Sequence, residues 1–355
     1  MSSSPGSFEP RGVRRLLHRF VPSHFQDPIG LARRLLGSRD PDAYAAMGHA
    51  ALGLACLPLD AALAPGEQAL YRTAPPPTLP LLFVCGPPRS GTTLVAQTLM
   101  AHLEVTWLTN LMSVFPRAPL RATALFHARL APWRPTYRSY YGRSRSLTAP
   151  NDSLPLWDRW LGADRARLRT ELSEAECAGL VQFFGALERQ AGRPVITKNN
   201  NLNCQAIPVA AALPGARFLC LDRDPLFLAQ ALLTARRQIH GDARVPYGLH
   251  PAFDPADDPI TSVCRQARAH HDLAMTQAAA LGPERFWRLS YEAFCERPAE
   301  SIRMVATRLL GLPESALKPI DPALRFTASR SARLDPVEFR ALEAGLAAAD
   351  AAPPA

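Results

Sequence analysis

The feature that most constrains this chain is a glycine-rich turn between two apolar stretches. Residues 81–86, LLFVCG, form a continuous apolar run, which is typical of a strand buried on both faces of a parallel sheet. The turn PPRSG follows, and residues 92–103 then place apolar side chains on one face of a predicted helix. A strand, a glycine loop and a helix in this order form an anion cradle, because backbone N–H groups and the positive end of the helix dipole converge there.

The alternation of strand and helix continues along the chain. Apolar runs predict further strands at 194–197, 217–221 and 286–292. Helices are expected at 226–239 and at 299–310, the latter ending at Gly311. This order indicates an α/β protein with a P-loop-like three-layer fold, in which helices flank a central parallel sheet.

The first 72 residues indicate helices instead of strands. Residues 13–20 and 30–36 carry apolar side chains at helical spacing with arginines between them, and the rigid segment 73–80, TAPPPTLP, then interrupts any helix. Such arginine-rich helices either pack on their own domain or make peripheral contact with a membrane. The expected units are a helical N-terminal extension (1–72), a main domain (80–340) and a C-terminal tail (341–355), frayed over 347–355.

Composition limits the partners only weakly. The net charge of +9 suits an anionic partner, but only Lys198 and Lys318 are lysines, so the basic residues are mostly dispersed arginines. We expect no nucleic-acid partner. Seven scattered cysteines, without a C-x-x-C pair or zinc spacing, indicate reduced thiols and no metal site.

Two observations predict a cytoplasmic protein. The first fifteen residues lack the apolar core of a secretory signal. The most apolar stretch, Met47–Leu59, is shorter than the ~20 residues that span a bilayer.

The glycine loop lacks one residue that nucleotide hydrolases need. The glycines of 86–93 have the spacing of a Walker loop, but Thr92 occupies the place of its lysine. That lysine reaches the β and γ phosphates, so its absence disfavours a P-loop kinase or NTPase, which is the alternative function. Arg89, three residues earlier, suits a shorter anion.

Residues 86–94, GPPRSGTTL, closely resemble the loop G-x-P-R-S-G-T-T-L of sulfotransferases that use 3′-phosphoadenosine 5′-phosphosulfate (PAPS). The resemblance implies that the 5′-phosphosulfate is bound by Arg89, Ser90, Gly91, Thr92 and Thr93. It extends more loosely over residues 80–340, including YEAFCERP at 291–298.

A second signature of this family is only partly present. In the family, an R-D-P arginine and a serine eight residues later hold the 3′-phosphate. Here Arg223 supplies the first, but Ala231 stands in place of the serine, and Thr234 one turn later compensates only in part. Losing one hydrogen bond to a charged group costs about 1.5–3 kcal/mol. A catalytically impaired sulfotransferase-like binding protein therefore stays open as an alternative.

The resemblance also implies that Lys198 contacts the transferring sulfuryl group, although a solvated or structural lysine fits the sequence too. Where one branch of the family has a histidine base, this chain has Asn200, which cannot accept a proton at neutral pH. Asp152 is the favoured base, or else a helix N-cap. The other candidates are Asp158, His102, His240 and Asp242.

Two more regions complete the predicted site. A family loop that closes over the nucleotide corresponds to 326–339, which makes Ser329, Arg330 and Arg333 candidate lid residues. Acceptor contacts are expected from the aromatic-rich region 105–165. The resemblance thus implies a metal-independent enzyme that moves a sulfuryl group from PAPS to a hydroxyl of a carbohydrate, lipid or other metabolite.

Overall fold

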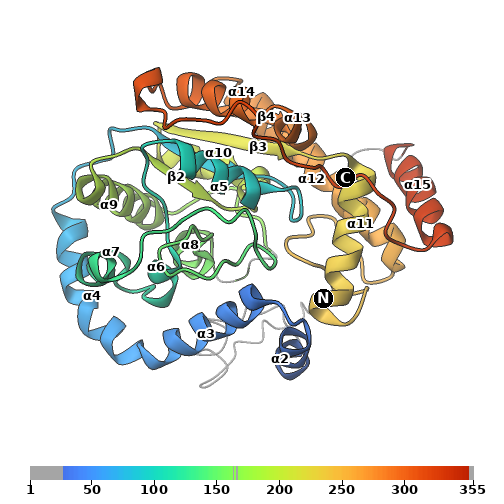
Figure 1. The fold of residues 1–355 in the computed structure, drawn as a ribbon, viewed down its shortest axis with the longest axis horizontal. Helices are drawn as coiled ribbons and strands as arrows, with labels where there is room; N and C mark the ends of the chain where they lie inside the picture. The colour runs from blue at the N-terminus through green and yellow to red at the C-terminus, as the bar shows by residue number, and fades with distance from the viewer. Residues whose placement is uncertain (1–26, 163, 165–166, 352–355) are drawn as a thin grey trace, which may run out of the picture.

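The computed structural model describes residues 27–162, 164 and 167–351, so the helix predicted at 13–20 lies outside the described residues. Figure 1 shows the helices and strands in place. The main elements are α2 (Pro28–Gly37), α3 (Pro41–Ala55), α4 (Leu57–Arg72), β1 (Leu81–Cys85), α5 (Thr92–His102), α6 (Asn110–Val114), α7 (Pro119–Phe126), α8 (Leu154–Leu161), α9 (Glu174–Ala191), β2 (Val195–Lys198), α10 (Leu202–Ala212), β3 (Ala216–Asp222), α11 (Pro225–Ala235), α12 (Pro259–Leu281), β4 (Phe286–Ser290), α13 (Tyr291–Glu296), α14 (Pro298–Met304) and α15 (Pro336–Ala351). Short π-helical turns, Arg236–His240 and Val305–Leu309, extend α11 and α14.

The strands form one parallel sheet in the order β2-β1-β3-β4. In its register, Phe83 of β1 lies between Thr197 of β2 and Phe218 of β3. The chain therefore runs from β1 to a neighbour on one side and then crosses to the other side. Such a switch in strand order opens a crevice at the carboxyl ends of the strands, where ligands of open α/β sheets bind.

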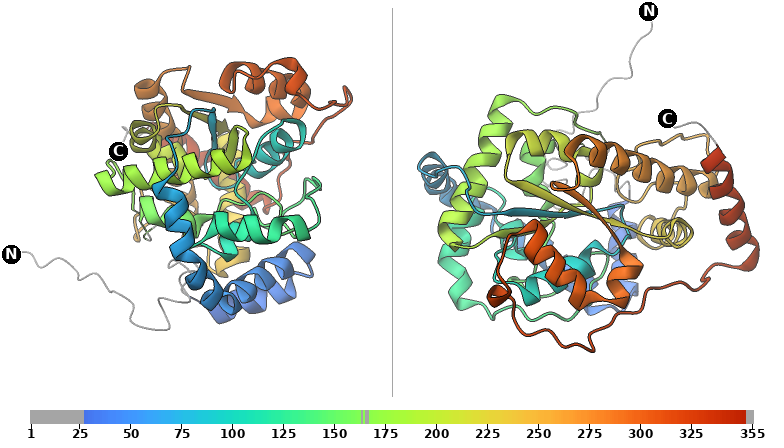
Figure 2. Two further views of the ribbon diagram at one scale, coloured as in Figure 1. Left: turned by 90° about the vertical axis from the view of Figure 1, so that its left-hand side faces the viewer. Right: turned by 90° about the horizontal axis from the view of Figure 1, so that it is seen from above.

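Alternate residues of β1 enter two separate apolar cores. Leu81, Phe83 and Cys85 pack with α8, α9 and α10, whereas Leu82 and Val84 pack with α5, α13 and α14. The two helix layers lie on opposite sides of the sheet (Figure 2). All five β1 residues are buried, as a strand inside a parallel sheet requires. The predicted three-layer α/β fold is confirmed.

The N-terminal helices α2, α3 and α4 follow the edge of the molecule opposite α13 and α14 (Figure 1). Two fully buried carboxylates fix α4 to the main domain. Asp60 accepts hydrogen bonds from the backbone N–H groups of residues 117–118, and Glu67 from those of residues 120–121, at 2.8–3.1 Å. Because α7 has no side-chain cap of its own, α4 supplies the acceptors that its first turn lacks.

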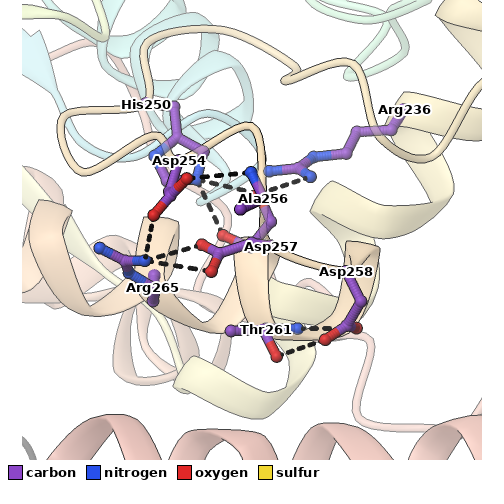
Figure 3. Close-up of polar contacts among 9 residues, drawn as sticks. Arg236, His250, Asp254, Ala256, Asp257, Asp258, Thr261 and Arg265 are labelled. Carbon is purple, nitrogen blue, oxygen red and sulfur yellow. Dashed lines mark hydrogen bonds and ion pairs between the residues drawn. The ribbon is translucent and has the colours of Figure 1, made fainter.

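The loop between α11 and α12 is tied down by its own polar side chains (Figure 3). Asp258 caps α12 by accepting from the N–H groups of Ile260 and Thr261 at 2.9 and 3.3 Å. Arg265 pairs with Asp257 at 2.9 Å, next to Asp254 in Figure 3. Gln266 of α12 also donates to the carbonyls of Tyr247 and Leu249, at 3.0 and 2.7 Å, and so positions Tyr247 and Gly248, which contribute to the site below.

Two sequence predictions at the C-terminal half were wrong. The strand predicted over 286–292 ends at Ser290, because Ser290 caps α13 instead by accepting from Ala293 N–H. The tail expected to fray is helical to Ala351: alanine favours helix, and Leu342 of α15 is fully buried against α11 and α12. Residues 352–355 lie outside the described part.

Candidate active site

A cavity of about 790 Å³ lies at the carboxyl ends of the four strands. Each strand contributes: Arg89 after β1, Lys198 at the end of β2, Arg223 after β3 and Tyr291 after β4. The structure brings most of the predicted site residues to this one cavity, namely Arg89, Gly91, Thr92, Thr93, Asp152, Lys198, Arg223 and Thr234. Ser90 lies buried beneath the loop, and Arg330 is exposed outside the cavity lining.

The loop 86–93 has a backbone that only certain residues tolerate. Gly91 has φ 96°, and a Cβ there would lie 2.2 Å from the Tyr291 ring, so the position requires glycine. Ser90 is fully buried, and its Oγ has no hydrogen-bond partner among the described residues. This Oγ faces Gly86, where an added Cβ would lie 2.7 Å from it, and is not part of the cavity lining, so an anion in the cavity meets the N–H groups of the loop instead.

Arg89 is held in place from two sides. Its guanidinium carbon lies 4.6 Å from the centroid of the Tyr141 ring, a cation–π contact, and its backbone has φ 72°. Arg223 Nη1 donates to the Arg89 carbonyl at 2.6 Å, and Arg223 Nη2 donates to the Ser329 carbonyl at 3.3 Å. Arg223 therefore joins the loop to the segment around Ser329 while also lining the cavity.

Lys198 and Asp152 form an ion pair at the floor of the cavity. Lys198 is only 5% exposed, and its Nζ donates to Asp152 Oδ2 at 2.8 Å. Burial by itself raises the pKa of Asp152, but the opposing charges of Lys198 and Arg143 outweigh it, and the pKa lies below its ordinary value. Asp152 does not cap α8, whose N-cap is Ser153. A carboxylate in this state is a weak proton acceptor and a strong partner for a cation.

A tight turn covers the Lys198 ammonium. Tyr140 and Arg143 pair through two backbone hydrogen bonds of 2.9 Å, and Gly142 between them has φ 84°. A Cβ on Gly142 would lie 3.5 Å from both Lys198 Nζ and Thr93 Oγ1. The lysine at the end of β2 and the threonine of the glycine loop therefore face the same small space.

The residues matched to the 3′-phosphate signature lie along α11. Ala231 and Thr234 both line the cavity, but the Thr234 hydroxyl already donates to the Gln230 carbonyl at 2.8 Å. The Gln230 side chain bonds both Ser331 O and Arg333 N, at 3.0 and 2.7 Å. These bonds hold the predicted lid segment against α11, and Ser329 and Arg333 line the cavity.

Sequence reasoning missed His49, which lines the cavity from α3. Burial and the nearby Arg143 charge lower the pKa of His49 below its ordinary value, although a hydrogen bond to the Arg145 backbone opposes them. The imidazole is therefore neutral at pH 7 and has one nitrogen that can accept a proton. Nothing in the sequence singled it out, because it stands in an apolar helical run without a motif. The other predicted base candidates, Asp158, His102, His240 and Asp242, do not line the cavity.

The aromatic-rich region 105–165 divides between core and cavity. Trp157 and Trp160 are buried in the core below the sheet, packed against Phe184. Tyr140 and Tyr141 line the cavity. Burial raises the pKa of Tyr141 to about 12, so its phenol stays protonated at neutral pH.

The described ranges, 27–162, 164 and 167–351, hold neither a single membrane-spanning helix nor a cluster of metal ligands. No single helix there is long and apolar enough to cross a bilayer; α3 and α4 meet the length and composition test only as a pair, bent by 70°. No group of three or more His, Cys, Asp or Glu side chains with metal-binding geometry occurs within those ranges. All seven cysteines are free thiols.

Of the comparisons with known proteins, one shows the family and another shows the fold. A family model described as the sulfotransferase family matches residues 80–315. A search of curated proteins finds no match. Among solved structures, the chain is similar to the sulfotransferase STF1 of Mycobacterium tuberculosis H37Rv, with 12% identity, coverage of 94% of this chain and 92% of that one, and a TM-score of 0.50. It is also similar to the sulfotransferase STF9 of Mycobacterium avium, with 14% identity, 94% and 86% coverage, and a TM-score of 0.50. At these identities the two likenesses show the fold.

Proposed function

Because this chain belongs to the sulfotransferase family, we propose that its cavity binds PAPS and an alcohol, and that it transfers the sulfuryl group to the alcohol hydroxyl. One observation carries the proposal. The anion-binding loop that follows β1 and the Lys198–Asp152 pair at the end of β2 line the same cavity, with Lys198 Nζ and Thr93 Oγ1 facing one space beside Gly142.

The residues present fit the sulfated end of the donor. The first N–H groups of α5, the Thr93 hydroxyl and the Arg89 guanidinium lie at the cavity and are donors suited to a 5′-phosphosulfate. The fit at the 3′-phosphate is poorer, because Ala231 has no hydroxyl and Thr234 already donates to Gln230. The donor, when bound, supplies an activated sulfuryl group.

Lys198 is placed to stabilise negative charge at the reacting end. Its ammonium has three N–H donors, of which one goes to Asp152, so two remain for a ligand. A preorganised cation in a site shielded from water lowers the energy of charge that develops on a leaving oxygen. Asp152 holds this ammonium in position at 2.8 Å, which favours a positioning role for the carboxylate.

His49 is the better candidate for the base that takes the acceptor proton. It lines the cavity as a neutral imidazole, whereas the carboxylate of Asp152 is engaged by Lys198. The ordinary pKa of histidine lies closer to neutral pH than that of aspartate, which makes proton transfer to His49 more favourable. The earlier assignment of Asp152 as base stays a prediction.

Calorimetry with 3′-phosphoadenosine 5′-phosphate, the product nucleotide, tests donor binding. We expect the wild type to bind and Arg89→Ala to lose at least about tenfold in affinity, since a hydrogen bond to a charged group contributes about 1.5–3 kcal/mol. Arg303→Ala is the matched control, because Arg303 of α14 is an exposed arginine outside the cavity lining and outside every predicted site segment. Failure of the wild type to bind, or equal losses in both variants, contradicts the proposal.

The two alternatives predict different results. A P-loop kinase or NTPase turns over ATP or GTP with magnesium, and Thr92 argues against it: its hydroxyl donates to Asn200 Oδ1 at 2.8 Å, where a lysine would be needed. A catalytically impaired protein binds the nucleotide but forms no sulfated product. Mass spectrometry of cells that express the wild type or Lys198→Ala distinguishes the active enzyme, since only the former accumulates product.

A further inference from the structure

One wall of the cavity differs in character from the rest. Helices α2 and α3 contribute only apolar side chains to it, apart from His49, and these are Leu31, Ala32, Leu35, Ala46, Met47 and Ala50. The spacing of these residues, at i, i+1 and i+4 on each helix, places them on one face. His49 is the single ionisable group of this wall.

The opposite side of the cavity is polar and charged. Arg89, Asp152, Lys198 and Arg223 line it, together with the backbone of the glycine loop. A ligand that fills the cavity therefore meets charge at one end and hydrocarbon at the other. The charged side suits the donor, as described above, which leaves the apolar wall for the acceptor.

The apolar wall selects against a polyhydroxylated acceptor. A sugar ring pressed against Leu35 and Met47 would lose water from its hydroxyls and gain no hydrogen bonds in return, and each such loss is costly. An alkyl chain or an apolar ring system has no hydrogen bonds to lose there, and its transfer out of water lowers the free energy.

Apolar side chains are also frequent on the outer surface of the same segment. Six of the eleven large hydrophobic side chains exposed among the described residues lie in the segment 29–59, namely Ile29, Leu36, Tyr44, Leu52, Leu54 and Leu59. The N-terminal helices are thus apolar on the face that lines the cavity and also on the face that meets solvent.

We propose that the acceptor is an alcohol carried on an apolar body, which packs against α2 and α3 while its hydroxyl lies between His49 and Lys198. This inference rests on the proposed sulfotransferase function and narrows its acceptor class. In the transfer, the acceptor O–H bond breaks and its proton goes to the His49 imidazole. The acceptor oxygen forms a bond to sulfur as the bond between sulfur and the bridging oxygen breaks. The electron pair of the broken bond stays on the bridging oxygen, which leaves with the nucleotide phosphate.

A series of primary alcohols from 1-butanol to 1-octanol, with glucose as the polar comparison, tests the acceptor class. With PAPS as donor, kcat/KM for the sulfated product is expected to rise about fourfold per added methylene, the factor for moving one CH₂ out of water. A flat series, or glucose used better than 1-octanol, overturns the inference.

Two matched variants on α3 locate the effect. Met47→Ser lies on the cavity face and should lower kcat/KM for 1-octanol by about tenfold or more, since burying a methionine side chain contributes at least about tenfold in affinity. Leu54→Ser lies on the exposed face, where Leu54 is 39% exposed, and should change nothing. Leu35→Ala on α2 repeats the test if Met47→Ser unfolds at a lower temperature than the wild type.

Two binding measurements separate this inference from the proposed function. Calorimetry with 3′-phosphoadenosine 5′-phosphate should give the same Kd for the wild type and Met47→Ser. Saturation-transfer NMR should detect 1-octanol on the wild type and lose it on Met47→Ser. If the nucleotide does not bind, the proposed function fails; if it binds but 1-octanol neither binds nor reacts, only the acceptor class is wrong.

Discussion

The two sides of the cavity are built on different principles. The strand-edge side depends on particular residues: Gly91 has no room for a side chain, Arg89 adopts a positive φ, and Lys198 is paired with Asp152. The side formed by α2 and α3 depends only on apolar side chains of suitable size, with His49 among them. Binding an anion requires fixed donors at fixed points, whereas binding hydrocarbon requires only the exclusion of water. The first side should be intolerant of substitution and the second tolerant.

Gly91→Ala should have the largest effect of the changes on the strand-edge side. The new Cβ would lie 2.2 Å from the Tyr291 ring. The alanine would also have to keep the positive φ of this position, which alone costs about 1–2 kcal/mol. The loop must then move, and binding of 3′-phosphoadenosine 5′-phosphate should be abolished in calorimetry.

Gly192→Ala serves as the control for backbone strain. Gly192 also has a positive φ, at 62°, but a Cβ there meets nothing within 4 Å. This variant should lose only the stability that a positive φ costs, about 1–2 kcal/mol by denaturant unfolding, while keeping its nucleotide affinity. If Gly91→Ala bound the nucleotide as well as Gly192→Ala does, the strand-edge side would tolerate substitution, and the proposed difference between the two sides of the cavity would be wrong.

His49→Gln tests the one polar group of the tolerant side. Removing a general base lowers kcat by about 10²–10⁴-fold, and nucleotide affinity should not change. Because the pKa of His49 lies below its ordinary value of 6.5, the wild-type kcat/KM should rise as the pH increases through that pKa and be level at neutral pH.

Asp152→Asn provides the comparison for His49→Gln. If Asp152 positions Lys198, this variant should keep the pH profile of the wild type at reduced kcat. Should it remove the pH dependence while His49→Gln retains it, the base is Asp152, as the sequence first indicated.

Ala231→Ser should have the smallest effect, and it should be a gain. Ala231 lines the cavity on α11 where the family pattern has a serine. One added hydrogen bond to a charged phosphate corresponds to about tenfold tighter binding of 3′-phosphoadenosine 5′-phosphate. A control nucleotide without the 3′-phosphate, adenosine 5′-phosphosulfate, should bind the wild type and the variant equally. If Ala231→Ser does not bind 3′-phosphoadenosine 5′-phosphate more tightly than the wild type, the 3′-phosphate does not lie beside residue 231.

The sequence predicted the strand-edge side well because its constraints are local. The order of strand, glycine loop and helix follows from apolar periodicity and from residues such as Gly86 and Gly91, and the sheet and loop are confirmed. The Lys198–Asp152 pair joins residues 46 positions apart, and no local pattern in the sequence announces it.

The apolar wall and His49 could not be predicted for a different reason. An apolar helix face looks the same whether it packs on a core or lines a ligand cavity, and α3 reads as an ordinary buried helix. The lid segment was placed by resemblance, which made Ser329, Arg330 and Arg333 candidates alike. In the structure Ser329 and Arg333 line the cavity and Arg330 does not. Its attachment to α11 through the Gln230 side chain depends on two long-range hydrogen bonds.

The carboxylates of α4 determine where this protein can be shortened. The family match begins at residue 80, yet Asp60 and Glu67 complete the hydrogen bonding of a helix start that lies well inside the matched part. A fragment starting at residue 80 would leave four backbone amides without their acceptors. Helix α4, which lies outside the matched range, is therefore part of the scaffold, and a helix that replaced it would have to supply two carboxylates at the same places.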